Sequence, residues 1–296
     1  MSLFHLFLVI LIVLVWGFNF VVIKIGLQGI PPFFLVFLRF FLTSIPAVFF
    51  IKKPEVSFRW VLTYGLILFA LQFSLLFWSM AEGLSPGLAS ILLQLQAFFT
   101  ALLALFFFGE KLNRWQIVGG VISFSGIGLV GMNLGEEISL TALVLAIAAA
   151  AFWGFGNILS KKMGKVNMFS LVIWGSFIAW PPLLAFSFLV EGPDKIADCL
   201  INLEWQSVGA ILYIISLATW FGFGSWNWLV QRYPLSTIAP FTLLVPIIGT
   251  MSSVICLGEP LQAWKIFAAV LVISGLCINL LGPRLAAQRK QPAVTD

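Results

Sequence analysis

The stretch Trp16-Gly17-Phe18 recurs in the second half of the chain as Trp153-Gly154-Phe155. A second echo pairs Gly109-Glu110-Lys111-Leu112 with Gly258-Glu259-Pro260-Leu261. The two motifs occur in the same order in both halves. The tryptophans lie 137 positions apart and the first glycines of the second motif 149 positions apart, so the second half contains extra residues between its motifs. Two related halves inside one apolar chain are typical of membrane transporters. The motifs therefore predict a protein that moves a solute rather than one that converts it.

The composition favours a lipid bilayer as the solvent of this chain. Of the 296 residues, 61% are hydrophobic and 9% are charged, and the mean hydropathy is +1.09. A soluble protein of this length needs more charge to stay dispersed, whereas a bilayer solvates apolar surface directly. The net charge of +5 does not indicate a nucleic-acid partner, since the basic residues stand at the ends of apolar segments and form no stripe.

Ten apolar stretches are long enough, at about 20 residues each, to cross the hydrocarbon core. They run over 4–27, 33–51, 59–81, 85–108, 114–134, 139–161, 168–190, 206–230, 234–257 and 262–282. The first has no basic leader and no cleavage site, so we expect it to be retained as a membrane helix. The predicted fold class is an all-α integral membrane protein with ten transmembrane helices. We divide it into five-helix repeats at 1–137 and 138–282, with a polar cytoplasmic tail at 283–296 that we expect to be disordered.

Lysine and arginine counts orient the chain. With the N-terminus in the cytoplasm, the predicted cytoplasmic segments carry twelve of these residues and the opposite side carries three. The positive-inside rule therefore places both termini in the cytoplasm. Because each half has an odd number of helices, the second half must enter the membrane inverted. Inverted halves place a solute site between them near mid-membrane, and exchanging their conformations opens that site to alternate faces.

Longer motifs resemble a known family. They are Gln94-Leu95-Gln96-Ala97-Phe98-Phe99-Thr100 and Ser170-Leu171-Val172-Ile173-Trp174, in addition to the Trp-Gly and Gly-Glu elements. With them the whole chain resembles the drug/metabolite transporter superfamily in its ten-helix EamA branch, and within that branch the O-acetylserine/cysteine exporters. The resemblance implies a bacterial inner-membrane location and efflux of cysteine, O-acetylserine or related small neutral amino acids. It also implies a small-molecule substrate and a lipid environment.

An amino acid is a zwitterion, so its site needs donors for the carboxylate and acceptors for the ammonium group. Arg39 is the one charge that falls well inside a predicted span. Mid-membrane it would cost about 2.5–3.5 kcal/mol on insertion scales, so it requires compensation. Two roles stay open for it. Its planar fork could bind a substrate carboxylate, or it could hold backbone carbonyls in a structural role.

Uncharged polar and aromatic side chains inside the spans are the other candidates for binding substrate, because an unpaired amide in an apolar span is costly. Gln94 and Gln96 lie about 200° apart on an α-helix, so we expect only one of them to face a cavity. Trp153, Asn157 and Lys161 share one helical face. The full set of candidates is Asn19, Arg39, Gln72, Gln94, Gln96, Asn157, Tyr213, Trp220 and Asn227, the last three of which fall on one stripe with Ser216 and Gly224. The alternative for each amide is a hydrogen bond between helices.

A further group is predicted to serve gating or packing. The tryptophans of the repeated motif precede glycines that permit close helix contact. Each is followed eight positions later by a lysine, which either anchors its helix at the interface or has a specific role. Prolines in the ninth span free backbone carbonyls and could form a hinge. This group comprises Trp16, Lys24, Trp153, Lys161, Pro240 and Pro246.

No catalytic, metal or cofactor site is predicted. Cys199, Cys256 and Cys277 are far apart, and His5 is the one histidine. No aspartate falls inside a span, and the glutamates nearest the membrane stand at span ends. The sequence thus indicates no proton relay, and facilitated or substrate-coupled efflux both stay open. We expect a monomer or a weak homodimer.

Other functions fit the sequence less well. A transporter of phosphorylated or nucleotide-linked sugars would need more cationic residues than Arg39 alone supplies. A channel would need a continuous pore, whereas paired halves suit alternating access. A membrane enzyme would need clustered acidic residues, histidines or cysteines at one depth, and a scaffold would need soluble domains.

Overall fold

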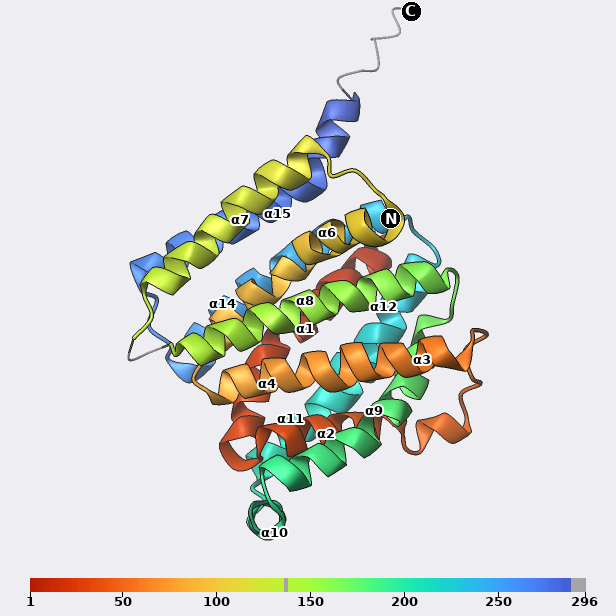
Figure 1. Cartoon of the computed structure of the whole chain (residues 1–296), viewed down its shortest axis with the longest axis vertical. Coiled ribbons are helices and arrows are strands. Elements are labelled where there is room, and N and C mark those ends of the chain that lie inside the picture. The colour runs from red at the N-terminus through yellow and green to blue at the C-terminus, as the bar shows by residue number, and fades with distance from the viewer. Residues whose placement is uncertain (136–137, 289–296) are drawn as a thin grey trace, which may run out of the picture.

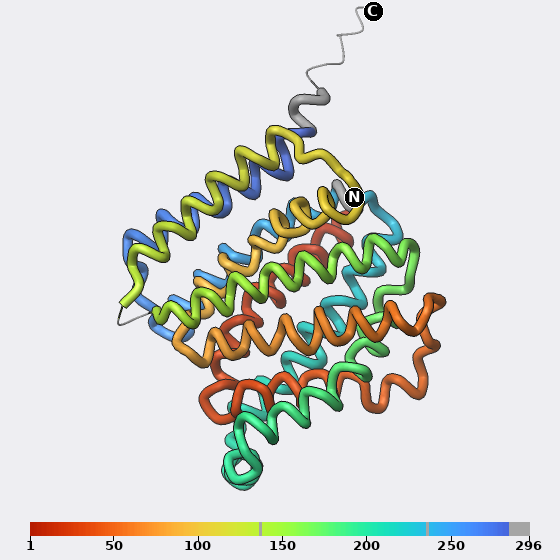
Figure 2. Tube along the Cα trace, viewed as in Figure 1, coloured from red at the N-terminus to blue at the C-terminus, as the bar shows by residue number. Residues whose placement is uncertain are grey.

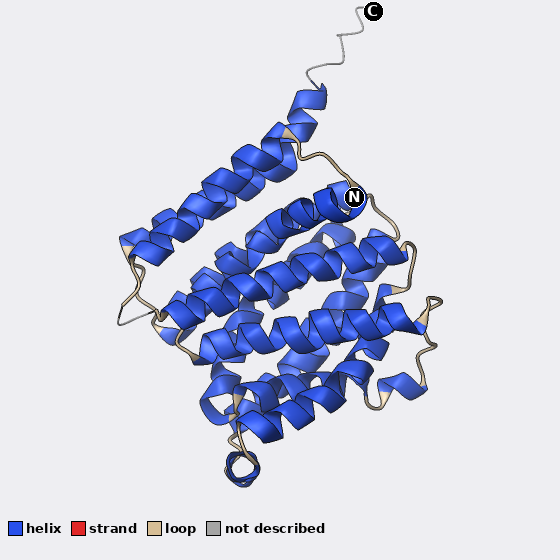
Figure 3. Cartoon of the chain, in the orientation of Figure 1, coloured by secondary structure: helices blue, strands red, loops and turns tan. Residues whose placement is uncertain are grey.

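The computed structural model describes residues 1–135 and 138–288. Within these residues every regular element is a helix, joined by short loops (Figure 3). Ten of the described helices are long and apolar enough to cross a membrane. The predicted fold class of ten transmembrane helices is therefore confirmed.

Several spans are built from more than one helical segment. In the first half the elements are α1 (Leu3–Gly29), α2 (Pro32–Ser44), η1 (Ala47–Phe49), α3 (Phe58–Tyr64), η2 (Gly65–Gln72), α4 (Phe73–Ala81), α5 (Pro86–Leu92), η3 (Leu93–Leu95), α6 (Gln96–Phe108) and α7 (Arg114–Met132). In the second half they are α8 (Leu140–Met163), α9 (Met168–Val190), α10 (Pro193–Ile201), α11 (Trp205–Tyr213), η4 (Ile214–Phe221), α12 (Gly222–Val230), α13 (Leu235–Ile238), η5 (Ala239–Leu243), α14 (Leu244–Leu257) and α15 (Ala263–Gln288).

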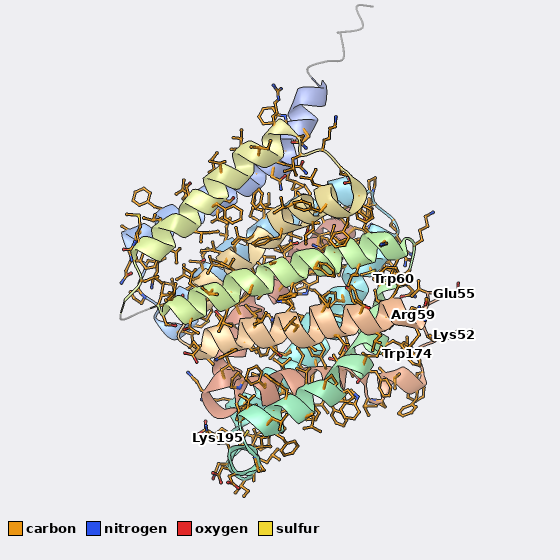
Figure 4. All side chains as sticks on the ribbon, viewed as in Figure 1. Lys52, Glu55, Arg59, Trp60, Trp174 and Lys195 are labelled. Atoms are coloured by element: carbon orange, nitrogen blue, oxygen red, sulfur yellow. The ribbon has the colours of Figure 1, made fainter. Side chains whose placement is uncertain are left out.

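The chain crosses the bundle back and forth, so that successive spans run antiparallel (Figure 2). At one edge α7 packs along α15, and toward the opposite edge α2 packs along α9 (Figure 1). Between these pairs α1 packs on α14 and α8 packs on α6. Charged side chains gather at the ends of the bundle: Lys52, Glu55 and Arg59 lie at one end and Lys195 at the other (Figure 4).

The glycines of the repeated Trp-Gly motif explain the two central contacts. A Cβ atom at Gly17 would lie 2.6 Å from Cβ of Ile248 on α14. One at Gly154 would lie 2.8 Å from Cβ of Phe99 on α6. Only a residue without a side chain permits this approach, as is common where membrane helices pack closely. The motif thus brings α1 against α14 and α8 against α6.

Irregular helical segments interrupt four spans at related positions. The π-helical segments η2 and η4 begin 149 residues apart, the same offset as the Gly-Glu motifs. The 3₁₀ segments η3 and η5 interrupt the fourth and ninth spans. Wide or tight turns shift the phase of the residues that follow, because they depart from 3.6 residues per turn. The predicted α-helical stripe from Tyr213 to Asn227 crosses η4, so its spacing does not hold.

Two boundaries differ from the sequence predictions. The residues from Pro283 to Gln288 were expected to be a disordered tail, but α15 continues through Pro283 to Gln288. The tail beyond it, 289–296, lies outside the described residues, as does position 137 at the predicted boundary between halves. The ninth span was expected from 234, whereas the segment that crosses begins at Ala239, after the short helix α13.

Candidate functional site

A cavity of about 170 Å³ lies between helices of the two halves, and the irregular segments η3, η4 and η5 each contribute to its lining. Helices of both halves contribute to its wall. The lining residues are Trp16, Asn19, Phe20, Ile23, Arg39, Phe73, Leu76, Ser90, Leu93, Gln94, Gln96, Trp153, Ala218, Phe223, Thr242 and Val245. A cavity of about 150 Å³ accommodates a molecule the size of benzene, so this one matches a small metabolite.

Arg39 is the one ionisable side chain in this lining. It is only 4% exposed, and its Nη2 donates to Oγ1 of Thr219 at 3.3 Å. Thr219 lies in η4, where its hydroxyl donates to the carbonyl of Ile214 and thus turns a lone pair toward Arg39. The guanidinium also lies over the ring of Phe73, 4.2 Å from the centroid, a favourable cation–π contact.

Two further nitrogens of the Arg39 guanidinium have no acceptor within the part of the chain that the structure describes. Nε and Nη1 are buried without a hydrogen-bond partner among the described residues. The ion pairs of the described residues do not include Arg39 either. A buried, unpaired guanidinium is costly, so these two donors need an acceptor that the cavity can admit.

Uncharged polar groups of the same wall come from α1 and the fourth span. Asn19 lines the cavity, and its Oδ1 is buried without a partner among the described residues. Gln94 Nε2 donates to the carbonyl of Thr242 in η5 at 3.2 Å. Gln96 Oε1 accepts from Asn157 Nδ2 at 2.6 Å, and Asn157 also donates to Thr100.

The prediction that only one of Gln94 and Gln96 could face a cavity is wrong, because both line it. It assumed an unbroken α-helix. The 3₁₀ segment η3 at Leu93–Leu95 breaks the helix at this point, and α6 starts afresh at Gln96. Both glutamines also hydrogen-bond to neighbouring helices, the role that was expected of only one.

Both motif tryptophans line the cavity. Trp16 Nε1 donates to the carbonyl of Ala218 in η4 at 3.0 Å, and its ring lies against Phe223 and Trp226. Trp153 lies against Phe73, with ring centroids 6.3 Å apart. Each indole therefore connects the first span of its own half to the irregular third span of the other half. Trp16 contacts η4, and Trp153 contacts the span that contains η2 and α4.

Five predicted binding residues lie outside the cavity lining. Tyr213 donates its hydroxyl to the carbonyl of Val15, and Trp220 donates Nε1 to the carbonyl of Thr43. Asn227 lines a separate, open groove between α9 and α12, together with Trp220. Gln72 is fully buried, and neither of its amide atoms has a partner among the described residues. Asn157 lies one hydrogen bond behind the wall, through Gln96.

The predicted prolines and lysines lie at helix breaks and helix ends. Pro240 belongs to η5 and Pro246 to α14, where the carbonyl of Pro246 accepts from Ser90 at 3.4 Å. Lys24 Nζ donates to the carbonyl of Met80 at 2.9 Å. Lys161 Nζ lies 2.5 Å from Oε1 of Glu110.

The sequence analysis did not select four residues that line the cavity or contact Arg39, namely Phe73, Ser90, Thr219 and Thr242. Ser90 and Thr242 are polar residues in apolar spans, so the rule that selected the amides could have found them. Phe73 and Thr219 carried no such signal, because an aromatic or a threonine in a membrane helix is ordinary. Only the tertiary contacts with Arg39 distinguish them.

Comparison with known proteins places this geometry in a family. The EamA-like transporter family matches residues 3–132 and, separately, residues 140–281. The chain belongs to the EamA-like transporter family. It is 41% identical to a protein of Salmonella typhimurium called "Probable amino-acid metabolite efflux pump", over 94% of this chain and 95% of that protein. It is 38% identical to a protein of the same name from Escherichia coli K12, over the same shares of the two chains.

More distant relatives are similar over most of the chain. A "Probable terminal-alkyne amino-acid exporter" of Streptantibioticus cattleyicolor is 23% identical, over 69% of this chain and 67% of that protein. One solved crystal structure superposes with a TM-score of 0.63 at 16% identity and covers 98% of both chains, which supports the fold. The EamA-like protein is therefore a transporter and not an enzyme, and its relatives support an efflux role. Ten apolar helices and bacterial transporter relatives support a multi-pass protein of a bacterial inner membrane.

Proposed function

We propose that this EamA-like protein exports small zwitterionic amino acids, namely cysteine, O-acetylserine or close neutral relatives. The observation that carries the proposal is the pair of unsatisfied groups in one cavity wall. Arg39 presents two buried donors without an acceptor, and Asn19 presents a buried acceptor without a donor. A carboxylate and an ammonium group on one small molecule would satisfy both.

The lining also favours a substrate without a charged side chain. Beyond Arg39, the wall offers amides, hydroxyls, aromatic rings and aliphatic side chains, and none of these lining residues is ionisable. A second charge on the substrate would enter a water-poor site without a counter-charge, at a cost of several kcal/mol or more. The cavity volume of about 170 Å³ further favours a short side chain. The names of the two most similar relatives given above, amino-acid metabolite efflux pumps, agree with this substrate class.

The transport step in the proposal is alternating access between inverted halves, with both termini in the cytoplasm. In support, the π-helical segments η2 and η4 share the 149-residue offset of the Gly-Glu motifs. Gly109 and Gly258, which begin those motifs, both adopt φ of 66° at the end of a helix. The glutamate of each motif contacts a lysine, Glu110 with Lys161 and Glu259 with Lys265. Elements related in this way can exchange conformations, and the cavity between them then opens to one side at a time.

The test compares binding of cysteine and of cysteamine, which lacks the carboxylate, to purified protein kept under reducing conditions. Arg39→Lys keeps the charge but loses the fork that binds two oxygens, and a hydrogen bond to a charged group contributes roughly 1.5–3 kcal/mol. Cysteine affinity should fall by about ten- to hundred-fold. Cysteamine affinity should not change between the two forms. An equal loss for both compounds would make Arg39 structural and overturn the carboxylate site.

A second measurement tests efflux itself. Proteoliposomes loaded with labelled cysteine, O-acetylserine, glutamine or threonine should release the first two faster than protein-free liposomes do. The Arg39→Lys protein, reconstituted at the same density, is the matched control for leakage. Release that does not depend on the protein would refute the substrate proposal and leave only the family assignment.

A further inference from the structure

The first turn of α2, the helix that carries Arg39, has no cap of its own. Pro31 precedes it and offers no side-chain acceptor. The first backbone N–H groups of a helix must find acceptors elsewhere. Here Phe33 donates to Oε1 of Glu191 at 2.7 Å and Phe34 donates to Oε2 at 3.0 Å. A carboxylate from another helix thus caps α2.

Glu191 is held in turn by the helix that it follows. Its backbone N–H donates to the carbonyl of Ser187 at 2.8 Å, and the Ser187 hydroxyl donates to Oε2 at 2.6 Å. Ser187 is fully buried. Next to this contact the rings of Phe33 and Phe186 meet edge to face at 4.8 Å. The C-terminal end of α9 lies beside α2 (Figure 1), and these contacts restrain the position and rotation of the first turn of α2.

The rotation of α2 decides where the guanidinium points. Arg39 lies five residues after Phe34, about 7.5 Å along the helix axis at 1.5 Å per residue. We propose that Glu191 is a positioning residue for the substrate carboxylate: by capping α2 it sets the depth and direction at which Arg39 presents its two unpartnered donors to the cavity. This inference rests on the proposed function, because it takes Arg39 as the partner of the carboxylate.

The cap depends on the charge of Glu191. Burial raises the pKa of the Glu191 carboxyl above its ordinary value, against the opposing effects of its three hydrogen bonds and of Lys195. On α10, the thiol of Cys199 also faces it, with a pKa raised by burial and by Glu191. Just after α4, Glu82 accepts from Trp78, whose ring contacts Phe33. A protonated carboxyl is a weaker acceptor for two N–H groups and no longer complements the positive end of the helix dipole.

The test repeats the cysteine and cysteamine binding measurements on Glu191 variants. Glu191→Ala removes both acceptors and should weaken cysteine binding about tenfold, the effect of misplacing a charged hydrogen bond rather than deleting it. Glu191→Gln keeps one acceptor oxygen and the fold, and should weaken cysteine binding by about two- to threefold. Cysteamine affinity should stay unchanged in both. Asp194→Asn, which removes a neighbouring negative charge without touching α2, is the matched control and should bind cysteine like the natural protein.

Hydrogen exchange and pH separate positioning from general stability. Exchange of the amides at 33 and 34 should quicken in both Glu191 variants while that of α9 does not change. Cysteine affinity of the natural protein should fall as pH drops through the raised pKa of Glu191, and that of Glu191→Gln should not. Stability should not fall in the same window. A carboxyl with a raised pKa binds its proton more tightly in the folded state, so its own contribution to stability grows as pH falls.

Two outcomes would overturn the proposal. One is an equal loss of cysteine and cysteamine affinity in Glu191→Gln, and the other is unchanged cysteine affinity in Glu191→Ala. The result for Arg39→Lys shows which idea has failed. If that variant discriminates between the two compounds and the Glu191 variants do not, only the positioning role is wrong. If Arg39→Lys does not discriminate, the carboxylate site itself is wrong.

Discussion

The two copies of the lysine and glutamate motifs make different contacts in the two halves. In the first Gly-Glu motif, Glu110 pairs with Lys161 at 2.5 Å, and both side chains are 50% exposed. In the second motif, Glu259 lies 3.7 Å from Lys265, and the side chains of Glu259 and Lys265 are 13% and 9% exposed. Ser253 also donates to Glu259. Lys24 lies within electrostatic range of Glu259 but donates to the carbonyl of Met80.

The difference follows from two positions. The second half has Lys265 and Ser253 where, 149 residues earlier, the first half has Gln116 and Ala104. Gln116 instead completes the capping box of α7 with Asn113. Repeated motifs thus fix where a glutamate stands, while residues outside the motif decide whether its charge is buried in a network or exposed in a simple pair. The two networks should respond very differently to substitution.

The largest effect is expected from Glu259→Gln. This substitution removes the negative charge of a largely buried carboxylate, while the positive charges of Lys24 and Lys265 remain nearby. Breaking a buried ion pair costs about 3–5 kcal/mol. The thermal unfolding midpoint in detergent should fall clearly. Glu55→Gln, which changes an exposed loop carboxylate, is the control and should leave the midpoint in place. A midpoint for Glu259→Gln within the error of the natural protein would show that its burial stabilises nothing.

Lys24→Met should have a smaller effect of the same sign. It removes a charged donor from the Met80 carbonyl, an interaction in the range of about 1.5–3 kcal/mol. Lys161→Met removes the matching lysine of the second half and should cost less than about 1 kcal/mol, because its partner is exposed. Unfolding midpoints measured side by side decide the comparison. Equal losses would mean that the two lysines have equivalent roles despite their different contacts.

A double-mutant cycle on Lys161 and Glu110 should yield a weak coupling. Exposed pairs typically contribute about 0.2–1 kcal/mol. The cycle uses Lys161→Ala, Glu110→Ala and the double variant, with unfolding monitored in mixed micelles. A coupling above about 2 kcal/mol would place this pair with buried networks and remove the contrast between the halves.

Raising the salt concentration should change stability least of all, but it should distinguish the exposed Lys161–Glu110 pair from the buried contacts of Glu259. Raising the ionic strength from about 0.1 M to 1 M shortens the Debye length from about 10 Å to 3 Å. The coupling of the exposed Lys161–Glu110 pair should vanish at high salt, whereas the loss caused by Glu259→Gln should persist. The same unfolding assay at both salt concentrations measures this. Persistence of both effects would indicate that the exposed pair is shielded from solvent.

Much of the fold follows from periodicity and composition. The apolar lengths predicted ten crossings, since a bilayer requires about 20 apolar residues for each. Six of the predicted residues line the cavity: Trp16, Asn19, Arg39, Gln94, Gln96 and Trp153. These are polar or bulky residues in mid-span, where the cost of burying them makes a specific role the best explanation.

Other predictions failed because they assumed regular helices. The stripe from Tyr213 to Asn227 crosses a π-helical segment, and the argument that separated Gln94 from Gln96 crosses a 3₁₀ segment. No local sequence signal marks either segment, because π and 3₁₀ turns differ from α turns by a small energy that packing can override. Tyr213 and Trp220 consequently donate to backbone carbonyls of neighbouring helices rather than to the cavity.

The sequence by itself determined the solvent, the number of crossings and the duplicated motifs, because hydropathy and repeated glycines act locally along the chain. Only the tertiary structure decided which polar groups share one cavity and which lack partners. Arg39 finds Thr219 from a span 180 residues away, and its helix is capped by Glu191 from another. Such contacts depend on how helices rotate against one another. That rotation is set by the sum of many weak packing contacts, which no single stretch of sequence contains.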